Sequence, residues 1–514
     1  MLARAHTFTI EDYQTRHVSV EVDIRPGLPG FAIVGLADAA VREARERVQA
    51  AIINSGYEFP SKRITANLAP GDVPKVGPGL DLALACAVLA ASKQLPHESL
   101  ESHVLFGELA LDGAVRPCQQ GTLAVAQATQ KAGLRALVLA PERAREAALI
   151  EGLEVAPVER LSSAVRVLGG GPADELPASE PATAATAATA GAGLTGPDLR
   201  DVRGQHHAVR ALIVAAAGGH NSLLSGPPGT GKTMLAQRLP SILPSLSRQE
   251  AIEVTRIHGM ASGAEDELAS RRPFRAPHHS ITTAGLIGGA RRGWVGEVVL
   301  AHNGVLFLDE LSEFARPTLE ALRQPLEDGR VAIVRARHSA VYPSRFMLVA
   351  ATNPCPCGYA GDWERCRCSE TELARHRRRL SGPLLDRIDL LVKLENEGAL
   401  GLDAAPLRSS EQAREQVMLA RERQAARLKD EGVAVNAQMD VPMLQRHAQL
   451  EQEAGDLLKK HQERGLLSVR GQHRVLRVAR TIADLNGSEQ VRARDLGSAL
   501  AMRSEAGHAG SRAA

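Results

Sequence analysis

An eight-residue motif, GPPGTGKT (226–233), constrains the fold of this chain more than any other feature. It follows the apolar segment SLLS (222–225) and precedes the helical pattern TMLAQRL (233–239). It fits G-x-x-x-x-G-K-[ST], in which glycines turn backbone N–H groups onto phosphates and the following helix adds positive potential. The alternative is a glycine-rich turn with a stray lysine, but the strand–loop–helix context favours a P-loop. The sequence therefore predicts a nucleotide site.

The P-loop gives specific roles to its side chains. Lys232 would contact the β- and γ-phosphates, and Thr233 would ligate Mg²⁺. The expected cofactors are therefore ATP and Mg²⁺. The nucleotide-binding residues that we expect are Gly226, Pro227, Pro228, Gly229, Thr230, Gly231, Lys232, Thr233 and Asp309.

Two further strand ends supply polar groups. The apolar run GVLFL (304–308) ends at Asp309 and Glu310, of which Asp309 would hold Mg²⁺ and Glu310 would polarise the attacking water. A buried strand that ends in an acidic turn is the alternative, and the upstream P-loop favours catalysis. Asn353 ends the next apolar run, where its neutral amide could orient the water, although Asn-Pro alone is a turn signal.

The pattern of apolar segments divides the chain into four parts. Alternating strand and helix patterns predict an α+β domain over residues 1–168, and residues 169–197 lack apolar periodicity and predict a flexible linker, with an Ala-rich helix as the alternative. Residues 198–398 predict a parallel α/β sheet covered on both faces. Residues 399–514 predict a helical lid.

Composition excludes several classes of protein. Aromatic residues make up only 3% of the chain, too few for the stacking platforms of a typical single-strand binder. Six cysteines in 514 residues exclude a disulfide-stapled scaffold. No apolar stretch reaches the roughly 18 residues of a membrane span, and the start lacks a signal-peptide pattern, so we expect a cytoplasmic protein.

Basic residues concentrate in the second half of the chain. Residues 196–514 carry 44 Lys/Arg against 37 Asp/Glu, whereas residues 1–170 carry 17 against 19. Such clusters favour sequence-independent phosphate contact, although any single cluster could be a solvated face or a subunit contact. The candidate clusters are Arg271, Arg272, Arg275, His278 and His279; Arg291 and Arg292 with Trp294; Arg335, Arg337 and His338; and Arg375 through Arg379.

Several longer motifs carry a resemblance to a known family. They are PFRAPHHSIT (273–282), GLIGG (285–289), GEVVLAHNGVLFLDELSEF (296–314), EALRQPLEDG (320–329), NPCPCG (353–358) and SGPLLDRIDL (381–390). Together with the P-loop they resemble the ComM/YifB family of magnesium-chelatase-like AAA+ ATPases, over most of the chain. The implied fold is an α/β AAA+ core with a helical lid, behind an α+β Lon-protease-like (ribosomal-S5-like) domain.

The resemblance implies an assembly. Such AAA+ proteins form hexamers with ATP at each subunit boundary, and they resemble replicative MCM helicases in their extra hairpins, here loops 285–296 and 329–343. Arg387 matches the arginine finger that reaches the neighbour's γ-phosphate, a role suited to a permanent planar cation. A surface pair with Asp386 or Asp389 is its alternative. Arg470 matches the sensor of the lid, with Arg474 as a near alternative.

The N-terminal part resembles the proteolytic domain of Lon without its catalytic pair. Gly79 occupies the position of the nucleophilic serine, and Thr122 occupies that of the activating lysine. Rescue by Ser92 or Lys131 would require a different geometry. We therefore expect no peptide hydrolysis, and a role in assembly, partner binding or DNA placement.

Four of the six cysteines fall within a short segment. Cys355, Cys357, Cys366 and Cys368 could close a tetrahedral Zn²⁺ site, although C-x-C is tighter than the usual spacing. Reduced thiols in a loop, or disulfides, are the alternatives. Cys86 and Cys118 lie apart and are expected to be small buried hydrophobes.

These features together predict an ATP-driven hexameric helicase or translocase. The family resemblance implies branch migration of single-stranded and branched DNA during natural transformation and recombination, with recombination proteins as candidate partners. The rival hypothesis is a remodelling chaperone of the magnesium-chelatase type that inserts metal or threads protein. An ATP-dependent protease is opposed by Gly79 and Thr122.

Overall fold

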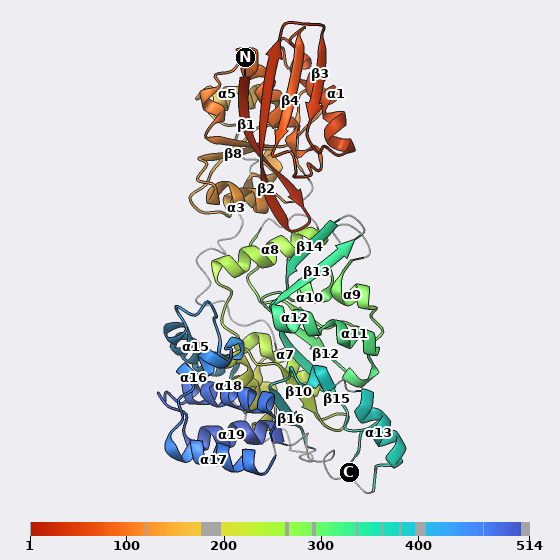
Figure 1. The fold of residues 1–514 in the computed structure, drawn as a ribbon, viewed down its shortest axis with the longest axis vertical. Coiled ribbons are helices and arrows are strands. Elements are labelled where there is room, and N and C mark those ends of the chain that lie inside the picture. Colours follow the sequence, from red (N-terminus) through yellow and green to blue (C-terminus); the bar gives the residue numbers. More distant parts are fainter. Residues whose placement is uncertain are drawn as a thin grey trace.

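The computed structural model describes residues 2–118, 121–175, 197–262, 267–289, 295–335, 338–360, 364–379, 382–395, 408–465 and 467–504. Two lobes are stacked along the long axis of the molecule, the N-terminal domain at one end and the remaining chain at the other (Figure 1). Most of the predicted linker, residues 176–196, lies outside the described residues. Its first part folds back on the N-terminal domain, where the amide N–H of Asp174 donates to the carbonyl oxygen of Pro157 (3.0 Å).

The N-terminal domain is a seven-stranded mixed sheet with the strand order β3-β4-β2-β1-β5-β8-β9. Its strands are β1 (Leu2–Glu11), β2 (Gln14–Arg25), β3 (Gly30–Val34), β4 (Arg63–Ala69), β5 (His103–Phe106), β8 (Ala136–Leu139) and β9 (Glu154–Pro157), and β6 (Glu108–Leu109) pairs with β7 (Val115–Arg116). Its helices are α1 (Ala39–Asn54), α2 (Asp81–Ala91), α3 (Thr122–Lys131), α4 (Ala144–Ala148) and α5 (Leu161–Leu168).

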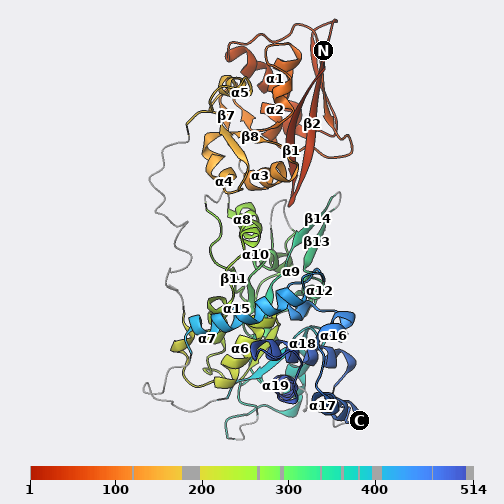
Figure 2. The same ribbon diagram turned by 90° about the vertical axis from the view of Figure 1, so that its left-hand side faces the viewer.

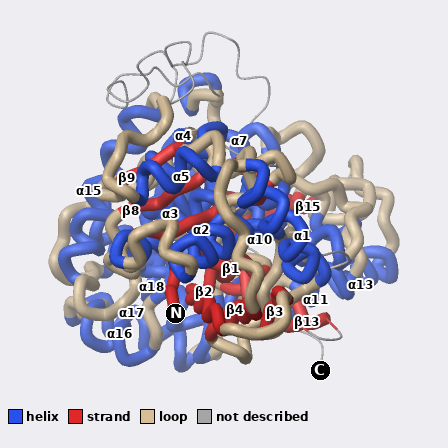
Figure 3. Tube along the Cα trace, turned by 90° about the horizontal axis from the view of Figure 1, so that it is seen from above, coloured by secondary structure: helices blue, strands red, loops and turns tan. Residues whose placement is uncertain are grey.

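Helix α2 is the centre of this domain. All of its residues are buried, because the run DLALACAVLAA offers an apolar surface on every side. Its one charge, Asp81, is paired with Arg47 of α1 at 2.7 Å. In Figure 3 the helices α1, α2 and α5 lie on one side of β1, β2 and β4. The α+β architecture predicted from the alternating pattern is therefore confirmed.

The second lobe is built on a five-stranded sheet in which every strand runs parallel, in the order β11-β12-β15-β10-β16. The strands are β10 (Ser222–Ser225), β11 (Phe274–Arg275), β12 (Val305–Leu308), β15 (Met347–Thr352) and β16 (Leu390–Lys393). All residues of β12 and β15 are buried, as expected for parallel strands covered on both faces. The predicted parallel α/β sheet is confirmed.

Helices and one hairpin surround this sheet. The helices are α6 (His206–Gly218), α7 (Lys232–Ile242), α8 (Arg248–Ser262), α9 (Thr283–Ile287), α10 (Glu297–Leu300), α11 (Arg316–Ala321), α12 (Arg323–Asp328), α13 (Glu370–Arg379) and α14 (Gly382–Leu385). The strands β13 (Arg330–Arg335) and β14 (His338–Pro343) pair antiparallel, which matches the hairpin expected in 329–343.

The C-terminal part is helical, as predicted. It contains α15 (Ser410–Arg427), α16 (Val441–His447), α17 (Gln452–Glu463), α18 (Val469–Leu485) and α19 (Ala493–Ser504). Residues of α15, α18 and α19 share one apolar cluster with α6, α7 and the sheet. None of the helices in the described ranges combines the length and apolar character that a bilayer crossing requires.

The two lobes meet through the β1–β2 turn and helix α8 (Figures 1 and 2). The Tyr13 ring lies 6.3 Å from the Tyr342 ring at the base of the β13–β14 hairpin. The Arg256 guanidinium lies 4.5 Å from the Tyr13 ring centre and donates to the Tyr13 carbonyl oxygen (3.0 Å). Ile252 of α8 is buried with Phe8 of the N-terminal domain. The N-terminal domain thus rests on the base of the hairpin.

A buried charge network holds the lid together. Asp484 accepts hydrogen bonds from Arg427 (2.7 Å), Arg480 (2.9 Å) and the side-chain amide of Asn436 (2.8 Å). Asp484 and Arg480 are both about 1% exposed. Two guanidinium groups therefore depend on one carboxylate.

We predict that Asp484→Ala destabilises the lid by about 3–5 kcal/mol, because it leaves buried guanidinium groups without their counter-charge. The measurement is urea unfolding followed by far-UV circular dichroism. The control is Asp456→Ala on the exposed face of α17, which should change the free energy of unfolding by no more than about 0.5 kcal/mol. Equal effects of the two substitutions would contradict this assignment.

Candidate nucleotide site

The loop of residues 226–231 connects the carboxyl end of β10 to the first turn of α7. A Cβ on Gly226 would lie 2.6 Å from the carbonyl oxygen of Leu394, so only glycine fits there. Gly231 precedes α7 with φ 86°, a left-handed conformation that favours glycine. The amino end of α7 therefore opens directly onto the loop, which is the arrangement that binds phosphates.

Lys232 connects the loop to the neighbouring strand end. Its Nζ donates to the carbonyl oxygens of Gly226 (2.7 Å) and Pro227 (2.8 Å) and to Oδ1 of Asn353 (3.1 Å). Burial lowers the pKa of Lys232, and the carboxylates of Asp309 and Glu310 act in the opposite direction. The structure thus brings Lys232 and Asn353 together, although they are far apart in the sequence.

Thr233 and Asp309 also meet. Thr233 Oγ1 donates to Asp309 Oδ2 (2.7 Å), and the other oxygen of Asp309 accepts from the backbone N–H of Glu310 (2.9 Å). A hydroxyl and a carboxylate oxygen held side by side are ligands that suit Mg²⁺. The predicted metal-binding pair therefore fits a hard cation next to the P-loop.

Glu310 has a further neighbour, His279, which the sequence did not connect with the nucleotide site. Its backbone adopts φ 51°, and His279 Nδ1 lies 3.3 Å from its carboxylate. The rings of His278 and His279 are 4.0 Å apart. Sequence patterns predicted His279 only as a candidate phosphate contact of DNA, because PHHS and the Asp309–Glu310 turn lie far apart in the chain.

Arg387 lies at the opposite end of the same sheet, where the parallel strands begin. It comes just before β16, whose first residue, Leu390, pairs with Ser222 at the start of β10. The P-loop follows Ser225, at the end of β10. The four residues of β10, each with a rise of about 3.3 Å, separate these two ends of the sheet. Arg387 and Lys232 of one chain therefore face different ends of the sheet.

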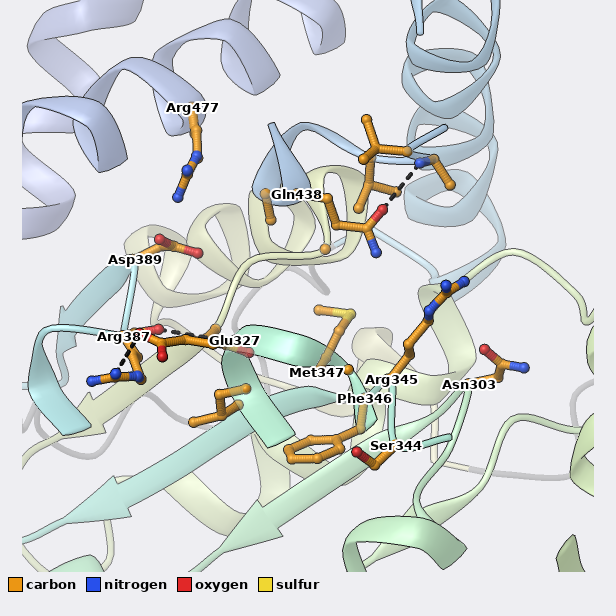
Figure 4. Close-up of a pocket in the computed structure, with 18 of the residues that line it drawn as sticks. Asn303, Glu327, Ser344, Arg345, Phe346, Met347, Arg387, Asp389, Gln438 and Arg477 are labelled. Carbon is orange, nitrogen blue, oxygen red and sulfur yellow. Dashed lines mark hydrogen bonds and ion pairs between the residues drawn. The ribbon is translucent and has the colours of Figure 1, made fainter. Parts of the chain in front are cut away.

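Arg387 donates to Glu327 (Figure 4). Both residues line a cavity of about 1020 Å³ at this end of the sheet. Cationic side chains outnumber carboxylates in its lining, which contains Arg272, Arg345, Arg387, Arg421, Lys429, Arg470, Arg474 and Arg477 beside Glu250, Glu327, Asp328 and Asp389. A basic cavity with an arginine at its wall is suited to a polyphosphate carried by another molecule.

The two candidate sensor residues differ in accessibility. The side chain of Arg470 is 77% exposed, and its Nη1 lies 3.9 Å from the carboxylate of Asp386. Arg474 is half-buried and points to the carbonyl oxygen of Ile388 (3.4 Å), and burial lowers its pKa. Arg470 is therefore the better placed of the two to contact another molecule.

The four clustered cysteines converge. Their Sγ atoms all lie within 4.8 Å of one another, with 3.3 Å between Cys355 and Cys357 and 3.9 Å between Cys355 and Cys366. Backbone N–H groups of Tyr359 and Arg367 donate to Cys357 and lower its pKa to about 6. The cluster could therefore hold a metal. Cys86, by contrast, is fully buried in α2, and burial raises its pKa to about 12.

Comparison with known proteins places these features in one family. Models described as magnesium chelatase subunit ChlI match residues 198–400 and 20–143, and a model of the ChlI C-terminal part matches residues 407–503. YifB of Escherichia coli is 43% identical over 506 residues, which cover 98% of this chain and 97% of YifB. An uncharacterized protein of Mycobacterium tuberculosis is 44% identical over 507 residues, or 98% of each chain.

The competence protein ComM of Haemophilus influenzae is 42% identical over 493 residues, which cover 95% of this chain and 94% of ComM. The chain belongs to the magnesium-chelatase-like ComM/YifB family. The P-loop, the acidic strand end and the cysteine cluster described above are therefore features of a ComM/YifB protein.

Some residues of the candidate basic clusters form ion pairs in this family member. Arg272 is largely buried and pairs with Glu250 (3.1 Å), and Arg275 pairs with Glu297 (2.6 Å). Phosphate contact by these two residues stays a prediction, and in this chain carboxylates distant in sequence pair with both of them. Arg291, Arg292, Trp294 and Arg337 lie outside the described residues, as do the side chains of Arg335, His338 and Arg377.

The N-terminal domain of this ComM/YifB protein has no room for a serine nucleophile at Gly79. A Cβ there would lie 2.6 Å from Cε2 of Phe106. Thr122 is buried at the start of α3. Ser92 follows the last residue of α2, whereas Gly79 lies before its first, and Lys131 is exposed at the end of α3. Among the described residues, these four positions form no Ser–Lys pair.

We predict that Gly79→Ser with Thr122→Lys does not restore proteolysis, because the serine must displace the Phe106 ring and the lysine would be desolvated. The measurement is ATP-dependent release of fluorescence from labelled casein. Overpacking should also destabilise Gly79→Ser by about 1–3 kcal/mol. Gly71→Ser is the stability control, since no atom lies within 4 Å of a Cβ there. Casein cleavage by the double variant would contradict the assignment.

Proposed function

We propose that this protein is an ATP-dependent hexameric DNA helicase or translocase that promotes branch migration. Its substrates would be single-stranded and branched DNA, and its role would be the integration of incoming DNA in natural transformation and recombination, with recombination proteins as candidate partners. Membership in a family that includes a competence protein supports this role. The observation that carries the proposal is the placement of Lys232 and Arg387 at opposite ends of the parallel strands of one sheet.

Each residue at the P-loop end of the sheet has a chemical task in ATP hydrolysis. Lys232 would exchange its carbonyl contacts for the β- and γ-phosphates. Thr233 and Asp309 would hold Mg²⁺, which neutralises charge on the phosphates. Glu310 would polarise the attacking water beside Asn353, and His279 would position the Glu310 carboxylate.

The second half of the site would come from a neighbouring subunit. A single chain cannot direct Arg387 at its own P-loop without crossing the sheet. In a head-to-tail ring, the basic cavity of one subunit would cover the P-loop of the next, and Arg387 and Arg470 would then approach its γ-phosphate. The bond from Arg387 to Glu327 would have to open when the ring forms.

The β13–β14 hairpin is the proposed DNA contact. Several basic residues outside the hairpin, such as Arg272, Arg275 and Arg379, are paired with carboxylates in this chain. Hairpins that project from each subunit would present a ring of cations to the phosphate backbone. Binding of this kind is independent of sequence and falls steeply with salt concentration.

Zinc is the metal that we propose for the four-cysteine cluster. Four thiolates form a closed tetrahedral donor set, which is typical of structural zinc and leaves no open position for catalysis. The proposed cofactors are therefore ATP and Mg²⁺ at the P-loop and structural Zn²⁺ at the cysteines.

A remodelling chaperone of the magnesium-chelatase type is the second candidate. The description of the matching family models favours it, since they are named after a subunit of magnesium chelatase. Such a protein would use the same ATP chemistry on protein or metal substrates. DNA dependence separates the two candidates.

We predict that branched or single-stranded DNA stimulates ATP hydrolysis several-fold and that ATP drives displacement of a labelled strand from a fork. Phosphate release and gel shift measure the two activities at low and high salt. Lys232→Ala should abolish both, whereas Lys459→Ala on the exposed face of α17 should leave both unchanged. ATP turnover that DNA does not stimulate, without strand displacement, would reject the helicase and favour the chaperone.

We also predict that mixing two inactive variants restores activity. Lys232→Ala and Arg387→Ala should each be inactive alone, because each removes a required side chain from every subunit boundary. In equimolar mixed rings about a quarter of the boundaries combine an intact lysine with an intact arginine, since each boundary uses one residue from each partner. Phosphate release should therefore recover partially. A mixture as inactive as its components would show that both residues act within one chain.

A further inference from the structure

The segment that follows Asn353 has almost no apolar core of its own. Among residues 354–360, 364–376, 378 and 379, whose burial the structure describes, only Cys355, Gly358 and His376 are buried. Helix α13 is strongly polar, and its exposed face includes Arg375, Arg378 and Arg379. A segment that buries so little surface needs another source of stability, as small metal-bound domains do.

The cysteine cluster can supply that stability. Four thiolates around Zn²⁺ at about 2.3 Å have sulfur–sulfur separations of about 3.8 Å in a regular tetrahedron. The observed separations are 3.3 Å for Cys355–Cys357, 3.8 Å for Cys357–Cys366 and 3.9 Å for Cys355–Cys366. Two of these three separations match the tetrahedral value, and the Sγ atom of Cys368 lies within 4.8 Å of the other three.

The loop closed by these cysteines rests on the P-loop. Gly358 has φ 88°, and a Cβ added to it would lie 2.5 Å from Cδ of Pro228. Its N–H donates to the carbonyl oxygen of Cys355 (3.0 Å), so the turn that contacts Pro228 contains two of the four cysteines, Cys355 and Cys357. Movement of the cysteines would be transmitted directly to the phosphate-binding loop.

The same segment also holds Asn353. His376 of α13 contacts the Asn353 carbonyl oxygen through Nε2 (2.9 Å), while the Asn353 side chain accepts from Lys232 (3.1 Å). Asn353 is thus fixed between α13 on one side and the P-loop lysine on the other. The described residues of the cysteine loop, 354–360 and 364–368, lie in the sequence between Asn353 and α13.

We propose that a Zn²⁺ held by Cys355, Cys357, Cys366 and Cys368 clamps the cysteine loop onto Pro228 and Asn353, so that ATP binding depends on this metal. The inference rests on the proposed ATPase function and adds to it a control of the nucleotide site. The zinc performs no chemistry on ATP. It fixes the shape of the loop that binds the phosphates.

The experiment compares the zinc-loaded full-length chain with the same chain after chelation and after zinc is added back. Elemental analysis gives the zinc content, and a fluorescent ATP analogue gives the nucleotide affinity. We expect one zinc per chain and an affinity at least about tenfold weaker after its removal, with recovery on reloading, because small displacements of a binding loop have large effects. Cys366→Ser with Cys368→Ser should reproduce the zinc-free behaviour.

A second variant tests the contact without touching the ligands. Gly358→Ala keeps the four cysteines and its zinc, but its methyl group would displace Pro228, so nucleotide affinity should fall. Gly133→Ala is the matched control, because Gly133 also has a positive φ (69°) but no atom within 4 Å of its Cβ position. It should leave the affinity unchanged.

The outcomes separate the two proposals. A chain without zinc, or one whose nucleotide affinity is the same with and without zinc, overturns the clamp. Unchanged affinity in Gly358→Ala overturns it as well. If the zinc-loaded chain binds the analogue but hydrolyses no ATP with or without DNA, the proposed function fails, while the clamp is still decided by the binding measurements.

Discussion

The parallel alignment of β10, β12, β15 and β16 is the constraint on which the rest of the arrangement depends. Because all four strands run in one direction, Lys232, Asp309 and Asn353 all lie at the carboxyl end of the sheet. Arg387 precedes β16 and therefore lies at the amino end. Burial of the strands on both faces fixes their register and hence the positions of these side chains. In the ring that we propose, these two groups would be the two halves of one nucleotide site, which a second copy of the chain would join.

The N-terminal domain adds a different constraint. It has a cavity of about 820 Å³ beside Gly79 and Phe106, but no nucleophile fits where the resemblance to Lon would place one. Its β1–β2 turn instead reaches the second lobe, where Tyr13 packs against Arg256 and Tyr342. Tyr342 lies at the base of the hairpin that we propose to contact DNA. The domain is therefore positioned to restrain that hairpin.

Local chemistry made much of the candidate site predictable. The P-loop, the Asp309–Glu310 turn and the four cysteines each depend on residues close in sequence, and the structure brings each group together as expected. Partners distant in sequence could not be predicted. Examples are the pairs Glu250–Arg272, Phe106–Gly79 and His279–Glu310. The two residues of each pair come from segments far apart in the chain, and nothing in either segment indicates the other. The parallel sheet was predicted from its buried central strands, whereas the strands β11 and β16 were not. The two residues of β11 are too few to show a pattern.

The most direct test of the shared site is a structure of the assembled protein with a non-hydrolysable ATP analogue and Mg²⁺. We expect a ring in which the guanidinium of Arg387 has left Glu327 and lies within hydrogen-bond distance of the γ-phosphate bound at the neighbour's Lys232. A nucleotide whose γ-phosphate is contacted only by residues of its own chain, with Arg387 still paired to Glu327, would contradict it.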